Sequence, residues 1–222
     1  MTKLFNDFAV SDVEFSEIKK NARGGKYILL SDNNQDIYLQ LPVLKAPFGI
    51  NEPGEQADEF SVNLTLTEDV STKLKELEVK VLDFVHKNSK ELFGKVHDKT
   101  VLKDALFVPL VKYAKDEEDA KKYAPTMKLK VSTGKGKYMA EFYQKLNGKP
   151  TLVEHTEVKK GTSLETIIRV GQIWFINGKF GVSLKLEQAK IQASTRLTGY
   201  AFKDEEVELD VPDEEESEAG SD

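Results

Sequence analysis

Two Asn-Gly pairs, Asn147-Gly148 and Asn177-Gly178, constrain the possible folds of this chain more than any other feature of its sequence. Asn-Gly readily adopts the two consecutive positive φ angles of a type I′ turn, which joins neighbouring antiparallel strands. Segments rich in strand-forming residues flank both pairs: 138–146 and 149–158 around the first, and 166–176 and 179–191 around the second. The second half of the chain is therefore predicted to form β-hairpins.

Strand-forming residues after Gly24-Gly25 predict a strand over 26–30, and alternating polarity predicts further strands over 36–41, 60–66 and 126–131. In 126–131, Lys128 and Lys130 are expected to point outward from a row of buried apolar residues. The same alternation in 179–191 places Lys185 outward and these apolar residues inward: Phe180, Val182, Leu184 and Leu186. Each of these strands is thus predicted to bury one face.

One long helix is predicted over residues 70–85, where apolar residues recur every three or four positions. Ser71 or Asp69 is expected to cap its N-terminus, and Gly94 is expected to end it. The apolar stripe must then pack on the sheet. A second, shorter helix is predicted over 115–123.

This order of elements predicts a mainly β fold with one long helix. A helix inserted midway into an antiparallel sheet matches an OB-fold-like antiparallel barrel with insertions, in which the helix closes one end. A general α+β sandwich fits the same order, and periodicity alone does not separate the two folds.

Charge is distributed very unevenly along the chain. The 222 residues carry a net charge of −6, but residues 203–222 hold one base and eleven acids, a charge of −10, so the rest carries +4. We interpret 1–202 as one folded OB-fold domain and 203–222 as a disordered acidic tail, because the tail has too few large apolar groups to fold. The acids considered for its function are Asp204, Glu205, Glu206, Glu208, Asp210, Asp213, Glu214, Glu215, Glu216 and Glu218. The tail is either a solubilising extension or a tethered polyanion that contacts a basic surface.

Several classes of function find no support in the sequence. The chain has no cysteine, and His86, His97 and His155 are scattered without the spacing of metal ligands. Ser163 lacks the nucleophile-elbow pattern, and Gly134 to Lys137 lack the ending of a phosphate loop. No apolar run has the length of a signal peptide or a membrane span. We therefore expect a soluble intracellular protein that is not an enzyme and has no cofactor, metal or membrane partner.

Basic residues interleaved with aromatic ones indicate a binder of single-stranded nucleic acid. Lysine and arginine neutralise phosphates without reading sequence, and bases stack on exposed rings. The candidate residues are Lys45, Phe48, Lys112, Tyr113, Lys128, Lys130, Lys135, Lys137, Tyr138, Tyr143, Arg169, Trp174 and Lys185. Trp174 has apolar neighbours on both sides, so it serves either the core or base stacking. Phe48 lies in a loop, where stacking and local packing are both open.

Three short motifs and the tail occur together in one order: 46–50 (Ala-Pro-Phe-Gly-Ile), 173–175 (Ile-Trp-Phe), 178–184 and the acidic C-terminal segment. In this the chain resembles the single-stranded DNA-binding proteins of tailed phages and of large DNA viruses of eukaryotes. The resemblance implies an OB-fold with a helix between its third and fourth strands. It also implies a role in DNA replication, recombination and repair, often as a homodimer, and for a viral protein a place at the host-cell site of viral DNA replication. Phe48 and Trp174 fall on the loop and strand positions of that family.

The resemblance further implies that the tail binds replication proteins such as the polymerase and helicase, and that it covers the DNA groove of its own chain. An alternative function from another class is an acidic-tailed chaperone or scaffold protein, whose tail binds basic proteins such as histones. The two differ in whether the body of the protein binds single strands.

Overall fold

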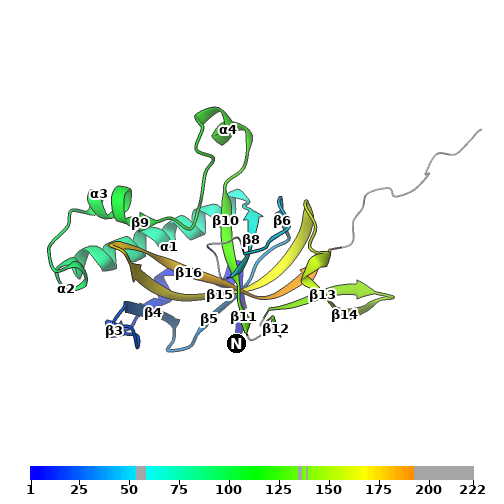
Figure 1. Ribbon diagram of the computed structural model, residues 1–222, viewed down its shortest axis with the longest axis horizontal. Helices are drawn as coiled ribbons and strands as arrows, with labels where there is room; N and C mark the ends of the chain where they lie inside the picture. The colour runs from blue at the N-terminus through cyan, green and yellow to red at the C-terminus, as the bar shows by residue number, and fades with distance from the viewer. Residues whose placement is uncertain (54–58, 135–136, 139, 193–222) are drawn as a thin grey trace, which may run out of the picture.

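The computed structural model of the protein describes residues 1–53, 59–134, 137–138 and 140–192. Within these residues, five strands form a closed ring, β6–β8–β10–β16–β15 (Figure 1). The ring strands are β6 (Leu44–Ala46), β8 (Phe60–Thr65), β10 (Thr126–Val131), β15 (Thr162–Ile176) and β16 (Lys179–Ile191). Numbered along the chain, the ring runs 1-2-3-5-4 and back to 1. Only its third and fifth strands pair in parallel. This arrangement is OB-like, so the predicted barrel is confirmed in preference to the sandwich.

Further strands extend the sheet beyond the closed ring. Near the N-terminus they are β1 (Thr2–Leu4), β2 (Val13–Phe15), β3 (Lys19–Lys20), β4 (Lys26–Asp32), β5 (Ile37–Gln40) and β7 (Ile50–Asn51). Later in the chain they are β9 (Phe107–Val108), β13 (Glu141–Leu146) and β14 (Lys149–Val153). Strands β11 (Thr133–Gly134) and β12 (Lys137–Tyr138) pair with each other in a separate two-stranded sheet. Strands β4 and β5 both pair with β15, so the sheet continues beyond the barrel on that side.

Both predicted Asn-Gly hairpins are confirmed. Asn147 and Gly148 have φ angles of 49° and 80° between β13 and β14, and Asn177 and Gly178 have 51° and 74° between β15 and β16. The β13–β14 hairpin and the segment that carries α4 project from the barrel in different directions (Figure 1).

The long helix α1 (Glu68–Lys87) has 20 residues. Its cap is Thr67, whose hydroxyl accepts a hydrogen bond from the Val70 N–H, so the prediction of Ser71 or Asp69 was wrong. Gly94 does not end α1, because α1 already ends before Asn88 and a separate short helix follows. Gly94 caps the C-terminus of that second helix with a φ of 79°. The other helices are α2 (Ser89–Phe93), α3 (Lys99–Val101) and α4 (Glu117–Lys122), with a π-helix at Leu102–Leu106 and 3-10 turns at Phe5–Asp7, Val10–Asp12 and His155–Glu157.

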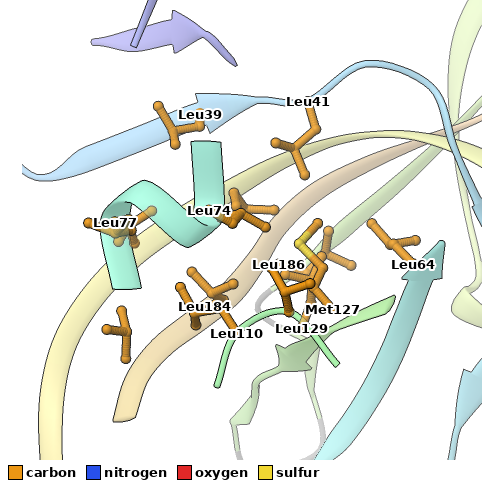
Figure 2. Close-up of a cluster of buried hydrophobic side chains, with 14 of the residues drawn as sticks. Leu39, Leu41, Leu64, Leu74, Leu77, Leu110, Met127, Leu129, Leu184 and Leu186 are labelled. Carbon is orange, nitrogen blue, oxygen red and sulfur yellow. The ribbon is translucent and has the colours of Figure 1, made fainter. Parts of the chain in front are cut away.

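Helix α1 lies between β8 and β10, which are the second and third strands of the ring. The resemblance implied a position between the third and fourth strands, and this expectation was wrong. Leu74 and Leu77 of α1 belong to the same buried cluster as leucines of β5, β8, β10 and β16 (Figure 2). The apolar stripe of α1 therefore packs on the barrel, as its periodicity predicts.

Polar side chains of α1 hold the segments around it. Lys73 Nζ donates to the carbonyl oxygens of Phe5 and Asn6, at 2.8 and 3.0 Å. The Glu78 carboxylate accepts from the N–H groups of Leu110 and Val111, at 2.5 and 3.0 Å. Burial raises the pKa of Glu78 above 4.5, although these two hydrogen bonds lower it. Glu78 thus fixes the start of the segment that carries Lys112 and Tyr113.

Two substitutions of Glu78 distinguish the effect of its hydrogen-bond acceptor on stability from the effect of its charge. We expect Glu78→Leu to lower the free energy of unfolding by about 2 kcal/mol or more, because two backbone N–H groups lose their acceptor. Glu78→Gln keeps an acceptor oxygen and removes a charge that burial disfavours, so it is expected to be at least as stable as the parent at pH 7. Because folding raises this pKa, the part of the stability that depends on protonation of Glu78 is fully present below pH 4.5 and is lost as the pH rises through the folded-state pKa.

Denaturant unfolding of the parent and both variants between pH 4 and pH 7 measures these effects. Equal destabilisation by glutamine and leucine at pH 7 would contradict the acceptor role.

None of the helices in the described part of the chain combines the length and the apolar character needed to cross a membrane.

Candidate nucleic-acid interface

A row of cations crosses the outer face of the barrel. Strand register places Lys130 of β10 beside Lys185 of β16, and Lys185 beside Arg169 of β15. Arg169 is paired on its other side with Tyr38 of β5, and its guanidinium carbon lies 5.9 Å from the centre of the Tyr38 ring. Directly paired residues share one face of a sheet. Lys130, Lys185 and Arg169 therefore form a continuous line, which we call the cationic row.

The cationic row lines a cavity of about 510 Å³, which we call the barrel groove. Its lining residues are Leu29, Asp36, Glu59, Lys130, Arg169, Gly171, Gln172, Trp174, Ile176, Ser183 and Lys185. The lining combines cations, two carboxylates and apolar side chains, and it includes the single tryptophan of the chain. A flexible polyanion whose flat aromatic bases can stack is the class of ligand that matches this composition.

Trp174 faces the barrel groove and is only partly buried, so it does not belong to the core. A β-bulge causes this orientation. Along β15, Leu164, Thr166, Ile168 and Val170 are buried, and unbroken alternation would bury Trp174 as well. The register shifts between Val170 and Ile173, which moves Ile173 inward and turns Trp174 outward.

Two contacts hold this part of the groove in shape. At the bulge, the Gln172 N–H donates to the Ser183 hydroxyl at 3.0 Å, and a Cβ on Gly171 would lie only 2.6 Å from that oxygen. Opposite Trp174, a Cβ on Gly181 would lie 2.8 Å from the indole Cζ2. The indole therefore rests closely on the Gly181 backbone, which leaves its other side toward the groove.

Two of the three cations of the cationic row form ion pairs with carboxylates. Arg169 lies 3.0 Å from Asp36, and Lys130 lies 2.9 Å from Glu59. Lys185 has no ion pair among the described residues, and within the same part of the chain the Arg169 Nε has no hydrogen-bond acceptor. The four paired side chains are between 36% and 54% exposed, and ion pairs of this kind contribute only about 0–1 kcal/mol. A phosphate can therefore replace either carboxylate at small cost.

Lys112 and Lys128 lie close to one another beside this row. Lys128 is two residues before Lys130 on the outer side of β10, and Lys112 forms a β-bridge with Thr126 at the start of that strand. Burial lowers the pKa of the Lys112 ammonium, and the nearby Lys128 lowers it further. The two ammonium groups repel one another, so an anion between them would relieve this repulsion.

Other predicted residues lie outside the barrel groove. Lys45 is exposed on β6, beside Thr65 and Ser163. Phe48 is 60% exposed in the turn that follows β6. The Tyr113 ring lies 5.0 Å from Lys75 Nζ of α1, and Tyr143 lines a separate cavity at the β13–β14 hairpin. Among the candidates, the structure thus groups Lys130, Arg169, Trp174 and Lys185 in one groove.

Some predictions fall on parts of the chain that the structure does not describe. Lys135 lies outside the described residues, as do the tail acids from Asp204 to Glu218. For Lys137 and Tyr138, the structure gives the backbone of β12 but not the side chains. Their roles remain predictions.

The histidines lie in unrelated places. His86 is exposed on α1, and His97 packs edge-on against Phe93. His155 lies in a 3-10 turn, so its predicted place in a hairpin strand was wrong. In the described ranges, no three His, Asp or Glu residues are grouped so that they could hold a metal ion.

Sequence reasoning missed Asp36 and Glu59, which line the barrel groove, and Tyr38, which contacts Arg169 beside it. Tyr38 was overlooked although the alternation of 36–41 places it on the outer face. Asp36 and Glu59 were overlooked because their importance depends on the strands that pair with theirs. No sequence pattern reports such pairing.

No protein-family model matches this chain, and no curated protein matches it. Among solved structures, it is similar to the single-stranded DNA-binding protein from bacteriophage Enc34 in complex with ssDNA, with 10% identity and a TM-score of 0.40, over 82% of this chain and 97% of that one. A second solved structure of the single-stranded DNA-binding protein from bacteriophage Enc34 gives the same identity and TM-score, over 86% of this chain and 96% of that one. A C-terminal truncation of the same phage protein also gives 10% identity and a TM-score of 0.40, over 85% of this chain and 99% of that one. At this level of similarity, the function of the present chain has to be inferred from its own groove.

Proposed function

We propose that the protein binds single-stranded DNA in the barrel groove, largely without regard to base sequence, and that it is not an enzyme. The observation that carries the proposal is that the partly buried side chain of Trp174 lines the same cavity as the cationic row. Cations neutralise phosphates whatever the sequence, and every base has a face that can stack on indole.

In this proposal the groove exchanges its own carboxylates for phosphates. Lys185 takes a phosphate directly, whereas Arg169 and Lys130 release Asp36 and Glu59 to do so. A base then stacks on the side of Trp174 that faces the groove, since Gly181 supports the other side. Lys112 and Lys128 attract the backbone as it passes β10.

We further propose that residues 1–202 form the binding domain and that the tail at 203–222 competes with DNA for the groove. The charges of +4 and −10 favour contact between these parts. The resemblance to phage and viral single-stranded DNA-binding proteins further implies a role in DNA replication, recombination and repair, with the tail binding partners such as a polymerase and a helicase and with the protein acting as a homodimer. At physiological salt the Debye length is about 8 Å, so the tail competes only when it lies close to the groove.

Salt titration of oligo(dT) binding tests both parts of the proposal. For the full chain and for a chain ending at residue 202, we expect log affinity to fall linearly with log salt, by about 0.7 for each phosphate neutralised. Three cations in the row predict a slope of about −2 or steeper. At low salt the shortened chain is expected to bind more tightly, and the difference is expected to shrink as salt rises.

The outcomes separate the rival functions. A flat salt response would show that the cationic row is not the binding site, and equal affinities at low salt would remove the competition by the tail. If the shortened chain does not bind single strands at all, the alternative of an acidic-tailed chaperone or scaffold is favoured.

A further inference from the structure

A second cavity, of about 530 Å³, lies between the β13–β14 hairpin and the β15–β16 ribbon. The hairpin is an insertion between β10 and β15 and is not part of the closed ring. Strand β13 pairs in parallel with β16, so that Tyr143 lies beside Lys190. We call this cavity the hairpin pocket and define it by Tyr143, Lys145 and Pro150 of the hairpin and Glu165, Ile167 and Lys190 of the ribbon.

The hairpin pocket combines apolar surfaces with cations at its rim. Ile167, Pro150 and the ring of Tyr143 supply the apolar part, and Lys145 and Lys190 supply the charge. The Tyr143 hydroxyl donates to Glu141 at 2.8 Å, which fixes the ring and raises the pKa of the phenol. An apolar pocket with an aromatic wall and lysines beside it matches a base that is followed by its phosphate.

A hydrogen-bonded carboxylate organises the rim. Glu165 accepts from Lys190 Nζ at 2.9 Å and from the Gln40 amide at 2.6 Å. The bond from Lys190 lowers the pKa of Glu165, so this carboxylate stays charged at neutral pH. As with Asp36 and Glu59 in the barrel groove, a phosphate that approaches Lys190 would compete with a carboxylate.

The two cavities follow one another along the same strands. On β15, Ile167 comes two residues before Arg169 on the outer face, and on β5 Gln40 comes two residues after Tyr38. Trp174 and Glu165 are nine residues apart on β15, which corresponds to about 30 Å of extended strand. A nucleic acid strand that leaves the barrel groove past Arg169 therefore meets the hairpin pocket next.

We propose that the hairpin pocket is a second nucleotide-binding site for the same DNA strand, with Tyr143 as its stacking ring and Lys145 and Lys190 as its phosphate contacts. The inference rests on the proposed function, because the barrel groove delivers the strand to it. A short oligonucleotide fills the groove alone, and a longer one fills both sites.

Oligonucleotide length separates the two sites. The full chain and the variant Tyr143→Ala/Lys145→Ala are titrated with oligo(dT) of about 5 and about 15 nucleotides, near the limits of known OB-fold site sizes. We expect the variant to bind the longer oligonucleotide about tenfold more weakly and the shorter one within about twofold of the parent. Tyr143→Phe, which keeps the ring and loses the bond to Glu141, is expected to bind both almost normally.

Tyr123→Ala is the matched control, because Tyr123 is 65% exposed and lines neither cavity. Unchanged affinity of Tyr143→Ala/Lys145→Ala for the longer oligonucleotide would overturn the proposal, and so would an equal loss at both lengths. A variant of the groove, Arg169→Glu/Lys185→Glu, is expected to lose binding at both lengths. If the parent binds neither oligonucleotide, the proposed function itself fails.

Discussion

Reversing two charges of the cationic row, with Arg169→Glu and Lys185→Glu together, is expected to weaken binding of single-stranded DNA by at least about 100-fold. The two residues are directly paired across β15 and β16, so the change places two new carboxylates between Asp36 and Glu59. Each lost hydrogen bond to a charged phosphate costs about 1.5–3 kcal/mol, and a loss of 3 kcal/mol already exceeds 100-fold. Fluorescence anisotropy of a labelled oligonucleotide at moderate salt measures this effect.

The matched control changes the net charge equally at another place. Lys87→Glu with Lys95→Glu alters two exposed lysines that line neither the barrel groove nor the hairpin pocket. We expect this control to weaken binding by no more than a few fold, through the general field of the protein. Equal losses for both double variants would mean that net charge governs binding, and the groove would then have no special role.

Replacing Trp174 with alanine is expected to weaken binding by about tenfold or more, because one stacked base contributes about 1–3 kcal/mol. Poly(dT) and mixed sequences are expected to be affected alike, and Trp174→Phe is expected to keep part of the affinity. Competition with unlabelled oligonucleotides of both kinds measures the loss. Thermal unfolding of Trp174→Ala checks that the variant is folded; some loss of stability is expected, because the indole is partly buried against the Gly181 backbone.

Phe48→Ala provides the aromatic control for this experiment. Its ring is 60% exposed but does not line the barrel groove. We expect a much smaller loss than for Trp174→Ala. A larger loss at Phe48 would move the stacking site to the turn after β6 and contradict the present assignment.

The strands and the main helix could be predicted from sequence because their signals are local. The Asn-Gly turns and the alternation in β10 and β16 need only neighbouring residues, and both agree with the structure. The helix ends were harder to predict, since Thr67, Asp69 and Ser71 all offer a capping oxygen and the selection depends on where the backbone leaves β8. The break at Asn88 also has no strong sequence signal.

The candidate site could be predicted only in part. Alternation shows that Lys130 and Lys185 point outward, but only the parallel pairing of β10 with β16 makes them neighbours. Trp174 was undecided because its apolar neighbours fit either face, and a one-residue bulge determines which face it takes. Pairing and bulges depend on contacts between distant segments, so a periodic pattern in one segment does not reveal them.

The intrinsic fluorescence of Trp174 tests the central claim most directly, because it is the only tryptophan of the chain. Emission from the full chain is followed while oligo(dT) is added, and binding is measured in parallel by anisotropy of the labelled oligonucleotide. We predict that the emission is quenched to saturation with the same midpoint as binding, and that Arg169→Glu/Lys185→Glu removes both changes. Tight binding without any change in Trp174 emission would contradict the assignment of the barrel groove as the DNA site.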